Sequence, residues 1–338
     1  MHIGMTPLRI SFAGGGTDMP EYYEKFGGHV VTTNINLFTY VIINKRHDDS
    51  FQTFSSDFEM HQSKVPYDEL EPRFGTEIAV TSLKLLNFRE GGDILICSDV
   101  KPGSGLGASS TLAVNFVNLI SNLQGKNWTK NKIAETAYHI EREILNHSIG
   151  KQDDYIAAYG GFNYIDFTKD KISVSPIELK KSTYQELDNN LLLFFVGNTR
   201  NSVVVLSEQV KQIQTQNPKT IDALHTVKEL SEELYSSLKR SDITKFGEIL
   251  HKGWTSKKKF TTGVTNEKID HVYDIALKNG AIGGKLTGAG GGGHLLLYSE
   301  KEKQSNLINK MNDLGLTHIP FNFHQSGPKI LNLGDFSS

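Results

Sequence analysis

Short runs rich in β-branched and aromatic residues predict a strand-rich first half of the chain. The longest run covers residues 27–46, GGHVVTTNINLFTYVIINKR, and shorter ones read LRISF at 8–12 and GDILICSDV at 92–100. Residues 50–62 alternate in part and predict a further strand. Side chains of these types fit the half-buried surface of a sheet better than a helix.

Three segments of the same half show the helical spacing of hydrophobic positions. Residues 77–88 and 132–146 repeat their apolar side chains at three- and four-residue intervals, and 111–125 carries the clearest stripe. Positions that recur in this way lie on one face of a helix. We therefore expect three amphipathic helices packed against the strands.

The second half has a different pattern, in which polar helical segments dominate and strands are few. The glycine at 280 closes one of the helices, as glycine commonly does at a helix C-terminus. The predicted elements are a strand at 190–197, three helices within 202–259, a helix at 266–280, two strands within 281–299, a helix at 301–315 and final strands within 317–333.

These two patterns predict an α+β fold rather than a regular alternation of strands and helices. The pattern changes between Lys169 and Asn190, so we place an N-terminal domain at 1–180 and a C-terminal domain at 181–338. A chain of 338 residues is long enough for two ordinary domains.

Composition narrows the classes of function. The net charge is −2 and charges of both signs are interspersed, which argues against nucleic acid as the main partner. The single cysteine, Cys97, lies in an apolar run, so we expect a buried packing residue and no internal disulfide. No apolar run approaches the length of a membrane span and the N-terminus lacks a signal-peptide core, so we expect a cytoplasmic protein without a membrane partner.

Three glycine-rich loops, each beside a predicted strand, point to a ligand site. They read AGGGTD at 13–18, PGSGLGASS at 102–110 and KLTGAGGGG at 285–293. One glycine loop is more often a structural turn, but three together favour backbone that a ligand approaches closely.

The loop at 102–110 precedes a predicted helix, and the amides at a helix start bind anions such as phosphate. It lacks the Lys-Ser/Thr pair of a Walker A loop, and no strand with the ribose-binding acid of a dinucleotide site follows about 20 residues on. Ser109 or Ser110 could supply a hydroxyl to a phosphate or a metal. Helix capping by these serines is the alternative, and the sequence leaves both open.

Two acidic residues are candidates for chemistry. Glu141 falls on the apolar stripe of the 132–146 helix, where a buried carboxylate needs a partner such as Mg²⁺. A structural salt bridge is the alternative for Glu141. Asp153 follows a glycine loop, and it or Asp154 can cap a short helix; the alternative for Asp153 is a general base that deprotonates a hydroxyl.

Taken together, the three loops resemble the three motifs of the GHMP kinase superfamily, which includes galactokinase, homoserine kinase and mevalonate kinase. The motifs stand in the family's order and span nearly the whole chain. The resemblance implies a GHMP kinase fold with an N-terminal α/β sandwich domain, a C-terminal ferredoxin-like domain and an active site in the cleft between them. It also implies ATP as co-substrate and Mg²⁺ as the metal.

The resemblance also assigns the reacting groups. Asp153 lies seven residues before Gly160, the spacing of the family's catalytic aspartate, and Arg9 matches an arginine near the reacting hydroxyl. In the implied reaction Asp153 accepts the hydroxyl proton, while Arg9 keeps the carboxylate ionised and stabilises the alkoxide. The ATP-binding residues implied by the second motif are Pro102, Gly103, Ser104, Gly105, Leu106, Gly107, Ala108, Ser109 and Ser110.

The metal ligands that the resemblance implies are Ser109 and Glu141. The alignment leaves Ser110 and Glu143 as alternatives, although the helical face favours Glu141. In this family Mg²⁺ bridges the β- and γ-phosphates and offsets the charge that develops during transfer.

Within the superfamily, residues 7–31, PLRISFAGGGTDMPEYYEKFGGHVV, are similar to bacterial D-glycero-D-manno-heptose 7-phosphate kinases, and fucose kinases share a similar stretch. The likeness implies transfer of the ATP γ-phosphate to the anomeric hydroxyl, giving a 1,7-bisphosphate. That product would feed nucleotide-heptose synthesis for capsule or lipopolysaccharide. A fucokinase-type or other sugar 1-kinase is the alternative.

The acceptor site is expected between the first and third loops. Arg200, in GNTRNS, is the candidate for the substrate's own phosphate, with a solvated loop arginine as the alternative. The third loop would close the site from the second domain. The acceptor-binding residues expected on this basis are Gly14, Gly15, Gly16, Thr17, Asp18, Arg200, Gly288 and Gly290.

Two functions of other classes stay open. One is a sugar-binding regulator that lacks catalysis, and the other is a nicotinamide-dependent enzyme that uses the glycines of GSGLGAS. The partners expected are ATP and a sugar phosphate, and a homodimer is an open alternative to a monomer.

Overall fold

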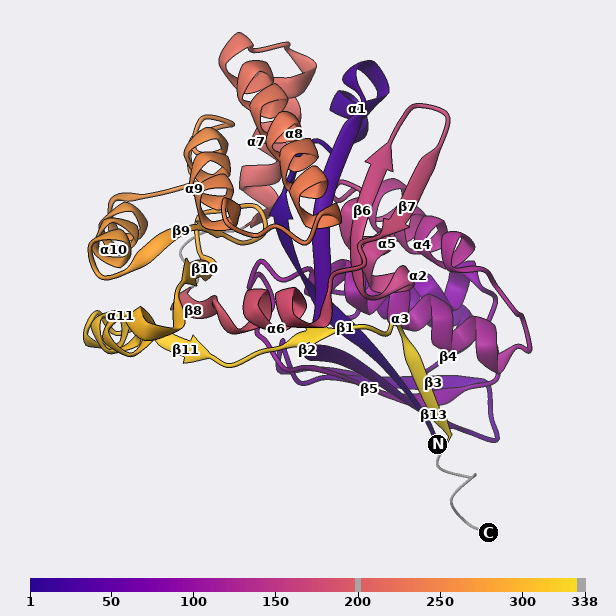
Figure 1. Cartoon of the computed structure of the whole chain (residues 1–338). Coiled ribbons are helices and arrows are strands. Elements are labelled where there is room, and N and C mark those ends of the chain that lie inside the picture. The colour runs from indigo at the N-terminus through magenta and orange to yellow at the C-terminus, as the bar shows by residue number, and fades with distance from the viewer. Residues whose placement is uncertain (198–201, 333–338) are drawn as a thin grey trace.

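The helices of the molecule pack on two β-sheets (Figure 1). The computed structural model describes residues 1–197 and 202–332. Within these ranges one sheet has nine strands and the other has four. The four-stranded sheet and its helices lie at the left of Figure 1, beside the nine-stranded sheet.

The nine-stranded sheet is built on one long central strand, β2, which pairs with β1, β5, β6 and β12. β13, from the end of the described chain, pairs antiparallel with β1 in the register His2 to Asn332. Only the β3–β5 pairing is parallel among the pairs of this sheet in the described ranges. Its strands are β1 (His2–Ala13), β2 (Gly28–Lys45), β3 (Ser50–Ser55), β4 (Met60–Pro66), β5 (Gly92–Ser98), β6 (Phe162–Phe167), β7 (Ile172–Pro176), β12 (Phe323–His324) and β13 (Lys329–Asn332).

The four-stranded sheet is antiparallel, in the order β11-β8-β10-β9. Strands β8 and β10 are rich in leucine, and every residue of β10 is buried. This sheet therefore forms the centre of a second core. The strands are β8 (Leu191–Gly197), β9 (Ala281–Leu286), β10 (Gly293–Ser299) and β11 (Thr317–Ile319).

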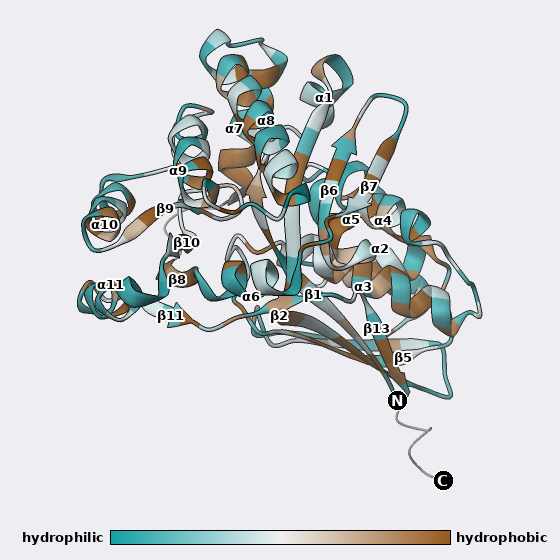
Figure 2. Cartoon of the chain, viewed as in Figure 1, coloured by the Kyte–Doolittle hydropathy of each residue, from teal (hydrophilic) through white to brown (hydrophobic). Residues whose placement is uncertain are grey.

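The helices cover both faces of strand β1. Residues 6–13 of this strand are all buried, with α3 and α5 packed on it as well as α8 and α9. Figure 2 shows hydrophobic residues concentrated on the strands and on helix sides that face them. The helices are α1 (Pro20–Phe26), α2 (Glu77–Leu85), α3 (Ala108–Leu123), α4 (Lys130–Tyr138), α5 (Gln152–Tyr159), α6 (Lys181–Asn189), α7 (Ser202–Gln214), α8 (Pro218–Lys239), α9 (Phe246–Lys257), α10 (Glu267–Lys278) and α11 (Lys301–Asp313), with short helical turns at Tyr67–Glu69 and His139–Ile144.

Most of the elements expected from the sequence are confirmed, and two differ in detail. The single strand expected at 50–62 is wrong, because Glu59 adopts a left-handed conformation with φ 52° and turns the chain into the hairpin of β3 and β4. The helix expected at 132–146 is α4 followed by a π-helical turn, His139–Ile144. Such turns change which side chains face inward, and they often occur at functional sites.

Helix α9 is held against β9 by a contact between two glycines. A Cβ at Gly283 would lie 1.9 Å from the carbonyl oxygen of Gly247 on α9, so only glycine allows this approach. Gly253 lies on the same helix, and a Cβ there would meet nothing within 4 Å. The pair of glycines therefore sets where α9, including its last residue Lys257, meets the sheet.

Replacing Gly283 by alanine is expected to lower the free energy of unfolding by about 1–3 kcal/mol, because the added methyl group overpacks the α9–β9 contact. The matched control is Gly253→Ala, which should be neutral or stabilise by up to about 1 kcal/mol through helix propensity. Denaturant unfolding of the two variants checks the prediction. Equal stability of the two variants would contradict a tight contact at Gly283.

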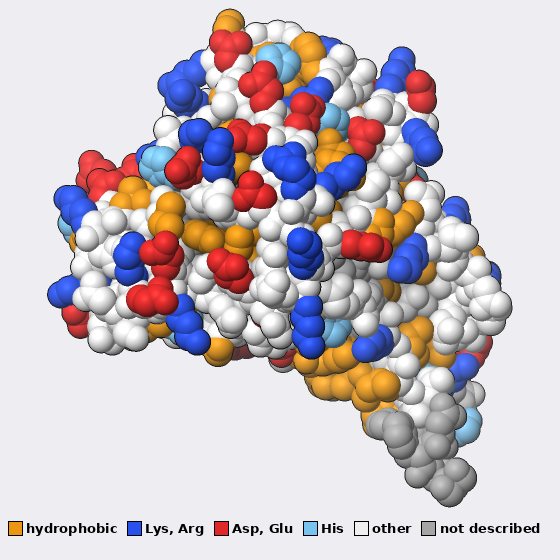
Figure 3. Space-filling model, viewed as in Figure 1, with side chains coloured by type: hydrophobic (Ala, Val, Ile, Leu, Met, Phe, Trp, Pro, Cys, Tyr) orange, Lys and Arg blue, Asp and Glu red, His pale blue; other side chains and the backbone are white. Residues whose placement is uncertain are grey.

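Charges of both signs are interspersed over the face seen in Figure 3, and no large area carries one sign. This agrees with the even distribution of charge along the sequence. Among residues 1–197 and 202–332, no helix is both long and apolar enough to cross a membrane.

Candidate active site

An ion pair between β1 and α5 lies at the centre of the site. The guanidinium of Arg9 donates from Nε to Asp153 Oδ1 at 2.6 Å and from Nη2 to Oδ2 at 2.5 Å. Its third nitrogen, Nη1, donates to the carbonyl oxygen of Gly105 at 2.7 Å. Arg9 is 4% exposed, whereas the side chain of Asp153 keeps 21% of its surface exposed. The arginine thus joins the carboxylate to the second glycine loop and leaves the carboxylate accessible.

The second loop leads into α3 through three glycines in the left-handed region. Gly103, Gly105 and Gly107 have φ values of 73°, 79° and 79°, which residues with a Cβ rarely adopt. Gly107 is the N-cap residue of α3 and no side chain caps this end. The alternative that Ser109 or Ser110 caps the helix is therefore wrong. The first amides of α3 remain available for an anion, as at other helix starts.

The second and third loops touch each other through glycines. A Cβ at Gly288 would lie 2.5 Å from the Cα of Gly105, and one at Gly105 would lie 2.6 Å from the carbonyl oxygen of Thr287. His294 of β10 supports the same contact, because its Nδ1 lies 2.8 Å from the carbonyl oxygen of Ser104. His294 is buried, as expected for a packed strand residue.

Ser109 and Glu141, which are 32 residues apart in sequence, meet in the structure. The hydroxyl of Ser109 donates to Glu141 Oε1, and His147 Nδ1 lies 3.5 Å from the same oxygen. Glu141 is completely buried on the π-helical turn, and within the described residues its Oε2 has no hydrogen-bond partner. Glu143, the alternative ligand, is exposed.

This arrangement fits a Mg²⁺ ion. Ser109 and Glu141 offer hydroxyl and carboxylate oxygens, the donor types that Mg²⁺ prefers, and the buried Oε2 lacks a partner. No group of three or more His, Cys, Asp or Glu side chains suited to a metal occurs in the described ranges. A site with few protein ligands agrees with Mg²⁺, which keeps waters and binds substrate phosphates.

The first loop supplies one acid and two glycines to the same region. Asp18 is buried and accepts hydrogen bonds from the amide of Gly16 at 2.9 Å and from the side-chain amide of Gln152 at 3.0 Å. Burial raises the pKa of Asp18, and the charge of Asp153 raises it further. Gly15, Gly16 and Asp18 line a cavity with Arg9 and Asp153.

Other residues expected at the acceptor shape the loops and do not line that cavity. Thr17 is fully buried and donates from Oγ1 to the carbonyl oxygen of Gly14 at 2.8 Å. A Cβ at Gly14 would lie 1.8 Å from the carbonyl oxygen of His29, and one at Gly290 would lie 2.6 Å from that of Val264. Arg200 lies outside the described residues.

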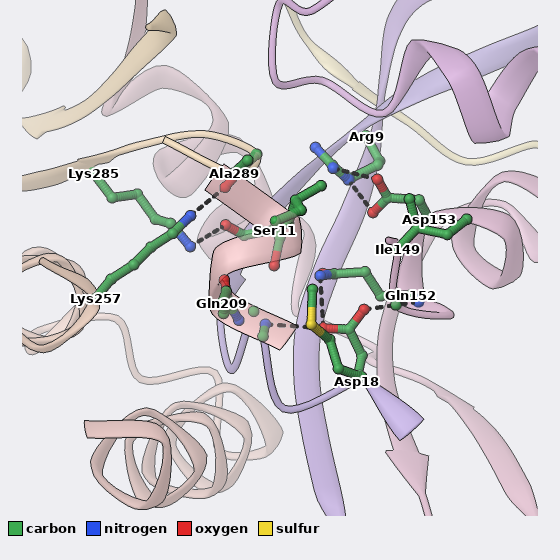
Figure 4. A pocket seen from close by; sticks show the side chains of 16 residues that line it. Arg9, Ser11, Asp18, Ile149, Gln152, Asp153, Gln209, Lys257, Lys285 and Ala289 are labelled. Carbon is green, nitrogen blue, oxygen red and sulfur yellow. Dashed lines mark hydrogen bonds and ion pairs between the residues drawn. The ribbon is translucent and has the colours of Figure 1, made fainter. Parts of the chain in front are cut away.

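Two cavities meet at the Arg9–Asp153 pair. The smaller cavity, about 80 Å³, is the one lined by the first loop, and it also contacts Gly288 (Figure 4). The larger cavity, about 520 Å³, is lined by Arg9, Asp153, Ser109, Glu141 and most of the second loop. Leu106 of that loop points into the core instead. The lining of the larger cavity also includes apolar side chains, among them Phe58, Phe74, Ile78, Ile96 and Val100.

Cys97 also lines the larger cavity, half-buried, so the expectation of a buried packing residue is wrong. The strand prediction placed it correctly on β5. Its exposure follows because the outer part of β5 borders the cavity rather than a helix. Burial nevertheless raises the pKa of its thiol.

Two buried lysines and two glutamines of the smaller cavity were not found from the sequence. Lys285 opens the third loop and donates to the carbonyl oxygens of Ser11 at 2.8 Å and Phe12 at 3.3 Å. Lys257, at the end of α9, donates to the carbonyl oxygen of Gly288. The glutamines are Gln152 on α5 and Gln209 on α7.

The buried lysines are electrostatically unusual. Burial lowers the pKa of Lys257 to about 8, and the charge of Arg9 contributes. Burial lowers the pKa of Lys285 well below its usual value, with help from the charges of Lys257 and Arg9. Lys285 is the first residue of the third glycine loop, and this position could have indicated a role in the site. Lys257, in TSKKKF, lies three residues after Trp254 and seven after Leu250, so helical spacing places it on the same face of α9 as these buried side chains.

Comparison with known proteins gives a consistent family assignment. Residues 75–161 match the model for GHMP kinases N terminal domain and residues 234–315 match GHMP kinases C terminal. The chain is 32% identical, over 96% of its length and 97% of the relative, to a D-glycero-alpha-D-manno-heptose 7-phosphate kinase of Campylobacter jejuni. It is 25% identical to an L-fucokinase/L-fucose-1-P guanylyltransferase of Bacteroides fragilis, covering 35% of that longer protein.

A solved structure shares the whole fold. The crystal structure of a D-glycero-D-manno-heptose 1-phosphate kinase from Bacteroides thetaiotaomicron superposes with a TM-score of 0.82, at 26% identity, over 98% of this chain and 99% of that one. The mixed α and β content and the two-sheet arrangement are thus those of the matched fold, and the fold class expected from the sequence is confirmed.

Proposed function

Because this chain belongs to the GHMP kinases and is a sugar phosphotransferase, we propose that it transfers the γ-phosphate of ATP to the anomeric hydroxyl of D-glycero-D-manno-heptose 7-phosphate. The product is then the 1,7-bisphosphate. The name of the Campylobacter jejuni relative supports this acceptor, as does the likeness of residues 7–31 to heptose kinases.

The observation that carries the proposal is the position of Asp153. Its partly exposed carboxylate lies where the smaller and larger cavities meet, so it can face an acceptor hydroxyl on one side and a nucleotide phosphate on the other. The apolar lining residues of the larger cavity can pack against an adenine ring, and the amides at the start of α3 can bind the phosphates. The smaller cavity suits the reacting end of a sugar.

The chain's own residues account for the transfer. Arg9 fixes the Asp153 carboxylate with two hydrogen bonds, so that it can take the proton of the attacking hydroxyl. Gly105 and Gly288 bring the two loops together around the phosphates and limit access of water. Ser109 and Glu141 would hold Mg²⁺, which when bound neutralises phosphate charge.

A fucokinase-type acceptor is the second candidate, and the relative from Bacteroides fragilis favours it. The two acceptors differ in that heptose 7-phosphate carries a phosphate of its own and fucose does not, so an assay with both sugars distinguishes the two functions. A regulator that binds sugar without catalysis is disfavoured because the Arg9–Asp153 pair and the Ser109–Glu141 pair are both assembled.

We expect phosphorylation of heptose 7-phosphate at O1 in a panel of sugars and sugar phosphates incubated with ATP and Mg²⁺. Phosphorus NMR distinguishes an anomeric phosphate from one at another carbon, and heptose 1-phosphate in the panel tests the opposite order of phosphorylation. Fucose and unphosphorylated heptose are the controls, with an expected kcat/KM lower by about 10²-fold or more, since neither carries the 7-phosphate whose binding energy the proposed acceptor supplies. Preferred turnover of fucose would replace the proposed acceptor, and no turnover with any sugar would favour the regulator.

A further inference from the structure

The smaller cavity is lined by two buried lysines in addition to the Arg9–Asp153 ion pair. Arg9 is paired with Asp153, but Lys257 and Lys285 also end there, and within the described residues neither ammonium has a carboxylate at ion-pair distance. In the part of the chain that the structure describes, their hydrogen-bond partners are main-chain carbonyl oxygens (Figure 4). Buried ammonium groups without a carboxylate are costly, and they are retained where an anion binds.

The position of Lys257 indicates which anion this is. Its carbonyl partner belongs to Gly288, which touches Gly105 of the loop assigned to the ATP phosphates. Lys257 lines the smaller cavity, and Gly288, which accepts its hydrogen bond, borders both cavities, so the ammonium lies one hydrogen bond from their junction. A phosphate carried at the other end of a sugar would lie away from this junction.

We propose that Lys257 is a catalytic residue that donates hydrogen bonds to the phosphoryl group as it passes from ATP to the acceptor. The inference rests on the proposed function and adds a residue to it. In the step, the bond from the acceptor oxygen to Pγ forms while the bond from Pγ to the β,γ-bridging oxygen breaks. The electron pair leaves with ADP, the hydroxyl proton goes to Asp153, and Lys257 keeps its protons.

A residue in this role acts mainly on the transition state, where charge spreads over the oxygens of the transferred group. Preorganised donors of this kind contribute to kcat more than to substrate binding. The neighbouring charges all come from other elements: Arg9 on β1, Asp18 after β1, Asp153 on α5 and Lys285 on β9.

The test is Lys257→Met, compared with Lys252→Met, an exposed lysine on the same helix. We expect kcat of Lys257→Met to fall by about 10²-fold. The KM values for ATP and sugar should change by less than about threefold, and Lys252→Met should match the wild type. A rise in sugar KM with kcat retained would instead assign Lys257 to the acceptor's own phosphate. Unchanged kinetics with a lower melting temperature would make the lysine structural, and either result overturns the proposal.

The dependence of kcat/KM on pH distinguishes a catalytic role of Lys257 from a structural one. Since the pKa of Lys257 in the free enzyme is about 8, the protonated donor is present below that pH and is lost above it. The kcat/KM of the wild type should therefore fall as the pH rises through about 8. In Lys257→Arg the donor stays charged, and this alkaline decrease should disappear. Its persistence would contradict the proposal, and the arginine variant also covers the case in which the methionine variant fails to fold.

The proposal and the proposed function fail in different ways. If the wild type does not phosphorylate heptose 7-phosphate, the acceptor is wrong, and the Lys257 variants are measured with the sugar that is turned over. We expect the enzyme also to transfer the γ-phosphate slowly to water, which is measured as ADP release without sugar. This reaction needs the contact of Lys257 with the phosphoryl group but no sugar acceptor. A wild-type rate of ADP release in Lys257→Met would overturn the role of Lys257 whichever sugar is the substrate.

Discussion

Replacing Asp153 by asparagine should reduce kcat by about 10³-fold, the loss expected when a general base is removed. Asparagine keeps the shape of the side chain but cannot take the proton of the acceptor hydroxyl. It also places an amide donor opposite the Nε and Nη2 donors of Arg9, which both bind the carboxylate in the wild type. ATP affinity should change little, because the contact of Arg9 with Gly105 does not pass through Asp153.

Steady-state kinetics and binding of a fluorescent ATP analogue together check this prediction. The matched control is Asp154→Asn on the same helix. Asp154 is fully buried, burial raises the pKa of its carboxyl, and the amide of asparagine has a similar shape. Near-normal turnover of Asp153→Asn would remove it from the role of base, and an equal loss in both variants would point to damage of α5 as a whole.

The second large effect is expected at the metal site, where Glu141→Gln should lower kcat/KM for ATP by about 10³-fold, through loss of a charged ligand that helps neutralise phosphate charge. Glutamine can still accept the hydrogen bond from Ser109, so the fold around the π-helical turn should survive. The loss should be smaller at high Mg²⁺ concentration, because a weakened site is filled by mass action.

Two measurements make this prediction specific to the metal. Calorimetric titration of Mg²⁺ into the ATP complex should show weaker binding in Glu141→Gln, independently of turnover. Glu143→Gln is the matched control, since Glu143 is two residues away and exposed. If Glu143→Gln lost Mg²⁺ affinity and Glu141→Gln did not, the assignment of the ligand would be reversed.

Local sequence patterns were sufficient for most of the secondary structure and for the loops of the site. The stripe on residues 111–125 became α3, with Phe116, Leu119 and Ile120 fully buried. The burial of Glu141 was predicted from its place on the apolar stripe of the 132–146 helix, and it is buried although it lies on the π-helical turn and not on a continuous α-helix. The glycine loops could be predicted because positions where two backbones touch have no room for a Cβ atom, and such positions therefore carry glycine.

What the sequence could not show depends on contacts between distant segments. Helical spacing puts Lys257 on the same face of α9 as Leu250 and Trp254, but it does not show that this lysine meets the third loop, where its ammonium donates to the carbonyl oxygen of Gly288. The hairpin of β3 and β4 was missed because partial alternation does not reveal a turn residue with positive φ.

The pairing of β13 with β1 has a consequence for how the protein is made. Residues 2–5 of β1 receive their outer neighbour only from residues 329–332. A ribosome therefore synthesises residues 6–328 before this edge can close, and until then the edge exposes unpaired amide and carbonyl groups. Residues 2–5 thus wait for an outer partner that is made more than 300 residues later, whereas the part of β1 that carries Arg9 pairs with β2, and a chaperone that shields such edges would act on residues 2–5.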